Sequence, residues 1–161
     1  MNRFVISLVF FLFFSCSNSE KNIDLEISRF EYSLFKINTS NVERLRNEWS
    51  VKFGSFSEFF DAEIIQRRGL SDALYYNELL LFTSHKDMRE AYDSIVVTFS
   101  DISKIEDELE LALFNFSKNF TSYPIPNIIT FFSGFNYGVV TYDNNIAIAL
   151  ESFLGQDSKF Y

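Results

Sequence analysis

Cys16 is the residue of this chain with the most definite chemistry, because it directly follows an apolar segment. Residues 4–14 are apolar except for Ser7. Eleven helical residues span about 16 Å, only half of the hydrocarbon core of a bilayer, so the segment is too short to cross a membrane. Ser15 then precedes Cys16, and a polar run follows over residues 17–21. This layout is typical of a bacterial lipoprotein signal, so we predict a diacylglyceryl-modified Cys16 at the new N-terminus.

The alternative is an ordinary secretory signal with a cysteine at its cleavage site by chance. Cys16 is the only cysteine, so its acylation would leave the rest of the chain without a thiol, a disulfide or a cysteine-ligated metal. Two or more acyl chains anchor a protein durably. Ser17 is not the acidic residue that retains some lipoproteins at the inner membrane. We therefore predict a lipid-anchored, periplasm-facing protein of the cell envelope, with the outer membrane favoured over the inner.

Catalysis would require a constellation of reactive side chains. His85, the only histidine, lies beside Lys86 in a predicted helix-start loop, where solvation explains it. A zinc site needs three or four ligands, and neither His-Glu-x-x-His nor a Gly-rich phosphate loop nor Gly-x-Ser-x-Gly occurs. The acidic run 106–110 is interpreted as a solvated helix face. We expect no catalytic residue, metal or cofactor within these residues, although a carboxylate dyad among the 22 acids stays open.

Five other residues are candidates for interaction or structure: Arg29, Phe30, Trp49, Phe135 and Tyr137. Arg29 follows an alternating strand pattern, so it could form an ion pair with a nearby carboxylate or contact a partner. Trp49 belongs to a phenylalanine-rich region for which core packing is the favoured interpretation and an exposed docking surface the alternative. Phe135 and Tyr137 precede a predicted hairpin strand.

The composition indicates which elements must position these residues. The 161 residues are 47% apolar and 22% charged, which fits one folded domain and argues against disorder. A net charge of −8 argues against nucleic-acid binding, because phosphate neutralisation needs clustered Lys and Arg. Few Gly and Pro residues disfavour an all-β fold with many turns. We predict a signal peptide over 1–16, a tether over 17–22 and a single domain over 23–161.

Helices dominate the first two thirds of that domain. Apolar residues recur at helical spacing over 42–53, 57–68, 71–82, 84–99 and 103–120. Ser40 with Glu43, and Ser103 with Glu106, match the capping-box pattern. The stripe of the last helix comprises Ile105, Leu109, Leu113, Phe116 and Phe120. We expect four or five helices, each burying one apolar face.

The last third changes to strand patterns. Residues 128–132 are a β-rich apolar run, and 138–142 and 146–150 flank an Asp-Asn-Asn turn typical of a hairpin. Residues 23–28 alternate between apolar and polar, and the segment 23–30 could join the same sheet. We predict an α+β domain with a small, mostly antiparallel sheet and a C-terminal hairpin. The chain stops on an aromatic pair, so we expect the natural protein to continue.

Several segments together resemble one protein family. They are Cys16, residues 27–35, 106–109, 123–126, 132–137 and 147–155, and the terminal residues 159–161. In this order the chain resembles the gliding motility lipoprotein GldB family of the Bacteroidota over nearly its whole body. The resemblance implies an envelope lipoprotein needed for gliding and linked to type IX secretion, with no established activity. Family members are about twice as long, which implies a missing C-terminal half.

The order of helices, sheet and hairpin also resembles the front half of a zincin-type metallopeptidase, by fold-level analogy. An extended peptide lies along the sheet edge in such folds, so β-augmentation near Phe135 and Tyr137 is one possible binding mode. The leading hypothesis is a non-catalytic protein of the gliding machinery that binds other gliding or secretion envelope proteins. The alternatives are a zinc peptidase whose metal helix lies beyond residue 161, or a peptide- or ligand-binding lipoprotein.

Overall fold

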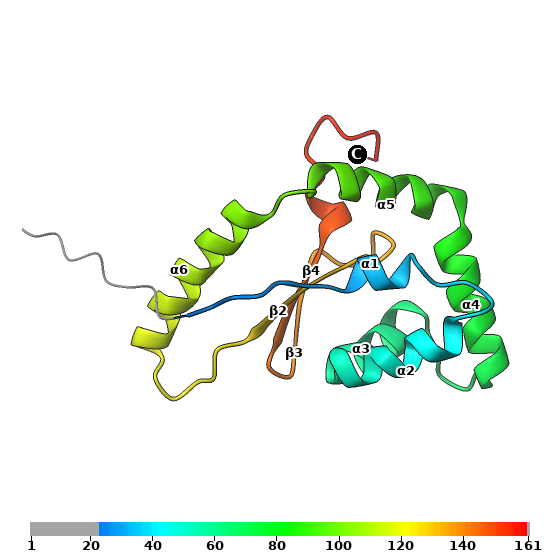
Figure 1. The fold of residues 1–161 in the computed structure, drawn as a ribbon, viewed down its shortest axis with the longest axis horizontal. Helices are drawn as coiled ribbons and strands as arrows, with labels where there is room; N and C mark the ends of the chain where they lie inside the picture. The colour runs from blue at the N-terminus through cyan, green and yellow to red at the C-terminus, as the bar shows by residue number, and fades with distance from the viewer. Residues whose placement is uncertain (1–22, 161) are drawn as a thin grey trace, which may run out of the picture.

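The computed structural model describes residues 23–160, and its architecture is α+β, as the sequence predicts (Figure 1). Within this range no helix is long and apolar enough to cross a membrane. The elements are β1 (Ser28–Arg29), α1 (Phe30–Leu34), α2 (Val42–Lys52), α3 (Ser55–Phe59), the π-helical turn η1 (Phe60–Ile64), α4 (Asp72–Ser84), α5 (Lys86–Thr98), α6 (Ser103–Asn119), β2 (Asn127–Phe131), β3 (Val139–Tyr142), β4 (Asn145–Ala149) and the 3-10 turn η2 (Leu150–Phe153).

The four strands form one mixed sheet in the order β1-β2-β4-β3. β3 and β4 form the predicted antiparallel hairpin, with Tyr142 opposite Asn145. The other two pairings are parallel, since β1 pairs with β2 and β2 with β4 in the same direction. The expectation of a mostly antiparallel sheet is therefore wrong. The reason is that β4 lies between β2 and β3, so the arm of the hairpin that follows the turn runs alongside β2.

One face of this sheet packs on α1–α5. Ile129 and Phe131 of β2, with Ala147 and Ala149 of β4, point into this side and are at most 3% exposed. Phe30 lies at its centre with ring centroids 4.8–5.3 Å from those of four aromatic neighbours. These neighbours are Trp49, Phe53, Phe56 and Phe60. The high phenylalanine content thus builds a tightly packed aromatic core between helices and sheet.

The helix predicted over 57–68 is replaced by a shorter, irregular unit. α3 passes into the π-helical turn η1, and the following chain includes Gln66 at a positive φ of 56°. η1 places Asp61 in the interior, where Arg46 Nε donates to Asp61 Oδ2 at 2.8 Å and the Tyr75 hydroxyl donates to Oδ1 at 2.5 Å. Burial, followed by the bond to Asp61, raises the pKa of Tyr75, so it remains a neutral donor. This buried network fastens η1 to α2 and α4.

Neither predicted capping box forms. Asn41 and Ile102 are the N-cap residues of α2 and α6, and neither side chain caps its helix. Glu106 instead accepts a long hydrogen bond from the backbone N–H of Ile27 at 3.5 Å. Ser71 does cap α4, accepting from the backbone N–H of Leu74. The serine-to-glutamate spacing was thus insufficient to form a capping box, and for Glu106 a tertiary contact occupies the carboxylate.

Candidate interaction surface

The second face of the sheet is covered by α6 at one end only. Strand residues alternate between faces, so Ile128, Ile146 and Ile148 point away from the aromatic core. α6 is 17 residues long, yet Leu113 is the one residue of this helix that is buried. It packs with Ile27 and Ile128 in a small second cluster. Figure 1 shows α6 standing apart from the group α1–α5, on the other side of the strands.

An apolar groove of about 430 Å³ remains between the N-terminal half of α6 and the sheet. Its α6 wall includes Ile105, which is 39% exposed, and its strand wall includes Val139, which is 54% exposed. The other lining residues are Ile27, Phe99, Ile102, Glu108, Leu109, Thr130, Ile148, Leu150 and Phe153. Contiguous exposed apolar surface of this kind marks binding sites for proteins, lipids or ligands. We name this site the α6 groove.

Two acidic side chains hold α6 to the N-terminal segment. Glu110 accepts from the backbone N–H of Leu25 at 3.3 Å, and Glu106 accepts from that of Ile27. Residues 23–27, predicted as part of a strand, therefore run along α6 without sheet pairing. The interpretation of this acidic run as a purely solvated face is wrong for these two glutamates, because their oxygens satisfy backbone donors.

Beneath the floor of the α6 groove lies a buried ion pair. Glu31 is fully buried, pairs with Arg29 Nε, and accepts from the Thr130 hydroxyl at 2.9 Å. Arg29 also donates to the Phe99 carbonyl at 3.1 Å and lies 4.2 Å from the centroid of the Tyr32 ring. The predicted ion pair of Arg29 is thus present, with Glu31 as its carboxylate. It joins β1, β2 and the end of α5 under the groove.

A second buried carboxylate holds the loop between β2 and β3. Glu151 accepts from the backbone N–H and hydroxyl of Ser133 at 2.6 and 2.5 Å, and from the backbone N–H of Phe135 at 3.2 Å. Burial raises the pKa of Glu151, and these hydrogen bonds oppose the rise without cancelling it. The loop that leads into β3 is therefore fixed by internal contacts.

The other predicted residues separate into core and surface. Phe30 and Trp49 are at most 1% exposed, and the Trp49 indole donates to Ser33 Oγ at 2.6 Å, so both are core residues and cannot form a docking surface. Phe135 is 40% exposed at a φ of 66°. Tyr137 is partly buried against Phe59. Cys16 lies outside the described residues.

Sequence reasoning did not find the α6 groove. Val139, Ile148 and Phe153 carry no motif, and Ile105 was expected to be buried. The available signal was the length of the apolar stripe on α6, which is greater than that of the short strands that could cover it. Spacing alone cannot show that a stripe is longer than its partner surface.

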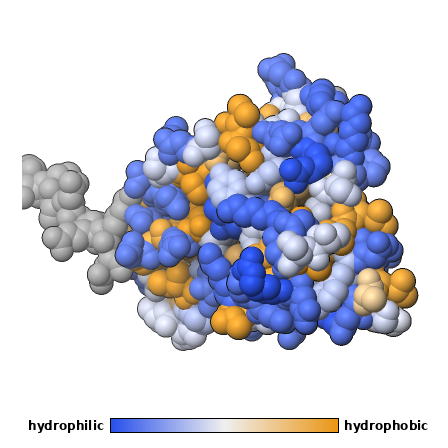
Figure 2. All heavy atoms as spheres, turned by 45° about the vertical axis from the view of Figure 1, so that its right-hand side comes forward, coloured by the Kyte–Doolittle hydropathy of each residue, from blue (hydrophilic) through white to orange (hydrophobic). Residues whose placement is uncertain are grey.

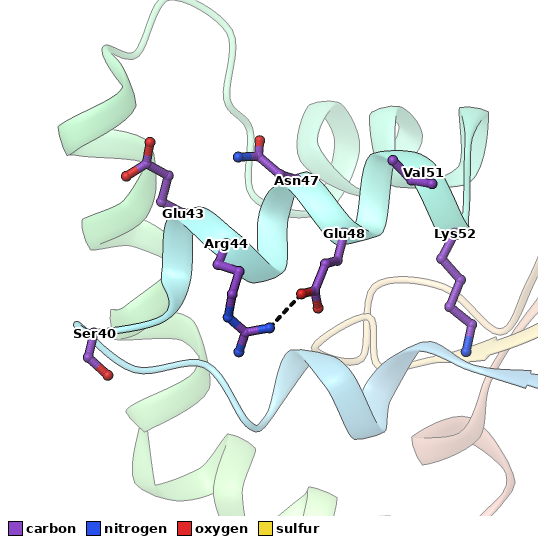
Figure 3. A pocket seen from close by; sticks show the side chains of 7 residues that line it. All are labelled: Ser40, Glu43, Arg44, Asn47, Glu48, Val51 and Lys52. Carbon is purple, nitrogen blue, oxygen red and sulfur yellow. Dashed lines mark hydrogen bonds and ion pairs between the residues drawn. The ribbon is translucent and has the colours of Figure 1, made fainter.

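Other exposed apolar side chains lie elsewhere on the surface, among them Val51 of α2. In the view of Figure 2, hydrophobic residues form separate spots in a mostly hydrophilic surface. A wide hollow of about 850 Å³ lies along the outer side of α2 and is lined by seven residues of α2 and the preceding loop (Figure 3). Arg44 and Glu48 form an exposed ion pair of 2.5 Å there, and Val51 is 87% exposed. This solvated helix face provides a control region for the α6 groove.

The comparison with protein families identifies the chain. The family model for the gliding motility protein GldB matches residues 15–161. The chain belongs to the GldB family. This result confirms the resemblance inferred from the sequence and shows a gliding motility lipoprotein family, consistent with the cell envelope. No curated protein and no solved structure matches the chain at a significant level, so the zincin comparison stays a prediction.

Proposed function

We propose that this GldB-family chain is a non-catalytic, lipid-anchored envelope protein that supports gliding by binding another protein of the gliding or secretion machinery. The observation that carries the proposal is the α6 groove. It combines exposed apolar side chains of α6, β3 and η2, namely Ile105, Val139 and Phe153, in a family whose members act in gliding motility. The apolar centre of a protein interface has this composition.

The anchor is proposed to be the acylated Cys16, at the periplasmic side of the outer membrane. The seven residue steps from Cys16 to Ile23 span at most about 25 Å. Ile23 packs beside the small cluster of Leu113 and Ile27, at the base of α6. Acylation would therefore keep the α6 groove close to the membrane surface, within reach of other envelope proteins.

A gliding assay tests the role of the groove. The full-length gene carrying Val139→Asp would be introduced into a strain that lacks it. A carboxylate in the apolar groove would be desolvated in a complex, so we expect gliding to fall at least tenfold at normal protein abundance. Val51→Asp on α2 is the matched control, because Val51 is also exposed but lies outside the groove. Normal gliding with Val139→Asp would refute the role of the groove.

The anchor is tested by Cys16→Ala in the same strain. Loss of the thiol prevents acylation, so we expect the protein to leave the membrane fraction and gliding to stop. Ser19→Ala in the tether is the control and should leave both unchanged. Restored gliding by an abundant Cys16→Ala protein would show that anchoring is not required.

A further inference from the structure

β3 is an open edge of the sheet. Among residues 23–160 it pairs with β4 alone, and the order β1-β2-β4-β3 places it last. The Gly138 carbonyl accepts from the backbone N–H of Ala149 at 2.8 Å. Hydrogen-bonded and non-hydrogen-bonded pairs alternate along an antiparallel ladder, so Val140 and Tyr142 direct their backbone groups toward β4. Val139 and Thr141 therefore direct theirs outward, away from the sheet.

The same two residues point their side chains to the face of the α6 groove. Val139 lies opposite Ile148 in the β3–β4 register, and both residues line the groove. Val140 and Tyr142 point to the other face, where the Tyr142 ring centroid lies 5.5 Å from that of Phe59. The outward backbone groups of β3 are therefore continuous with exposed apolar surface. An unprotected edge of this kind is a template for another strand.

We propose that an extended segment of the partner protein pairs with β3 as a fifth strand and places alternate apolar side chains in the α6 groove. This inference rests on the proposed function and adds the mode of recognition. Backbone hydrogen bonds to Val139 and Thr141 would supply affinity, and the groove would select for side-chain size. At about 430 Å³ the groove has room for only a few apolar side chains.

Charge argues against a second copy of this chain as the source of the segment. The chain has a net charge of −8, so two copies paired through β3 would bring like charges together. Glu108 lies at the rim of the groove, and Asp143 follows β3 directly. Glu108 is paired with Lys104 at 3.8 Å, so Asp143 is the acidic group that favours a neutral or basic partner segment. The partner strand is therefore expected to alternate apolar residues and to carry Lys or Arg at the end beside Asp143.

Site-specific cross-linking in gliding cells tests the pairing. Benzoylphenylalanine would replace Val139 or Thr141 in the full-length protein, with Val51 as the control position. Because side chains on one face of a strand are two residues apart, positions 139 and 141 should react with one partner at residues two apart. Position 51 should not react with that segment. Attachment sites three or four residues apart would indicate a helix and overturn the strand pairing.

A proline variant provides a second readout. The backbone N–H of Thr141 points away from β4, so Thr141→Pro removes an edge donor without breaking the ladder. We expect this variant to lower the adduct from position 139 at least tenfold, while Thr141→Val leaves it unchanged. An unchanged adduct with the proline variant would overturn strand pairing. If a thermal unfolding assay shows that the proline variant is not folded, the spacing of the attachment sites from positions 139 and 141 decides whether the partner segment pairs as a strand.

The outcomes separate this inference from the proposed function. An adduct at position 139 without strand spacing would leave the groove as a protein-binding site and refute the strand. No adduct at 139 and none at Phe153 in gliding cells would refute both. Attachment to a segment of the same polypeptide, or to a second copy of the chain, would overturn the assignment to a different partner.

Discussion

The two faces of the sheet come from the same strands but have different environments. On the core face, Ile129 and Phe131 are at most 3% exposed and lie against the aromatic side chains of α1–α5. On the other face, exposure rises across the sheet, from 1% at Ile128, which packs with Leu113, to 54% at Val139 on the open edge. The difference shows that an apolar strand residue is buried only where another element packs on its face of the sheet.

The aromatic residues explain why the faces differ. Phe30 connects four rings on the core face. On α6, by contrast, Phe116 stacks on Phe120 with ring centroids 5.0 Å apart, and Phe120 contacts Tyr123. These rings pack within the C-terminal end of α6 and its following loop. The apolar side chains in the N-terminal half of α6, Ile105, Leu109 and Leu111, are all aliphatic.

The largest effect is expected for Phe131→Ala on the core face. Removing a fully buried ring leaves a cavity, so we expect the free energy of unfolding to fall by about 4 kcal/mol. Val139→Ala, on the other face, should cost well under 1 kcal/mol, since the side chain is exposed. Urea unfolding followed by the fluorescence of Trp49, the only tryptophan, measures both. Equal losses would contradict the difference between the faces.

The second largest loss of unfolding free energy is expected when the ion pair between Arg29 and Glu31 is broken. Arg29→Ala would leave the carboxylate of Glu31 buried without its cation, so we expect a loss of about 3 kcal/mol. Arg44→Ala removes the cation of an exposed pair on α2, and its cost should stay below about 1 kcal/mol. The same urea titration compares the two arginines. If Arg29→Ala lowered the free energy of unfolding by less than Arg44→Ala does, Glu31 would have found another partner.

Alanine substitutions along α6 test how far the packing of this helix on the sheet extends. Leu113→Ala should cost about 2 kcal/mol because Leu113 packs with Ile27 and Ile128. Ile105→Ala, two turns earlier, should cost less than about 0.5 kcal/mol in the free protein, since Ile105 is 39% exposed. The contrast between the two unfolding midpoints is the measurement. A large cost for Ile105→Ala would mean that the groove closes in solution.

The smallest effect is a pH dependence from Glu151. Burial raises its pKa above the ordinary value of 4.5, so the folded state binds this proton more tightly than the unfolded state. The free energy of unfolding should therefore fall as pH rises from 4.5 through the raised pKa, and then level off. Glu151→Gln should remove this contribution. The test is to measure the free energy of unfolding of the wild type and of Glu151→Gln across pH 4–8. A difference between the two that does not change with pH would contradict the role of Glu151.

The sequence predicted much of the fold because local rules govern it. Helical spacing located α2, α4, α5 and α6 to within a few residues, and the Asp-Asn-Asn turn located the hairpin. The candidate site was predicted less well. The burial of Trp49 confirms the favoured interpretation of core packing, and Phe30 is also a core residue. An ion pair of Arg29 with a nearby carboxylate was predicted, but the structure was needed to identify Glu31 as its partner.

By itself the sequence determined most of the element types and the family, because each depends on residues close together in the chain or on their order. The tertiary structure alone decided the parallel pairing of β2 with β4, the burial of Asp61 and the α6 groove. Periodicity shows which residues share one side of an element. It does not show whether another element covers that side, and this coverage separates core from binding surface.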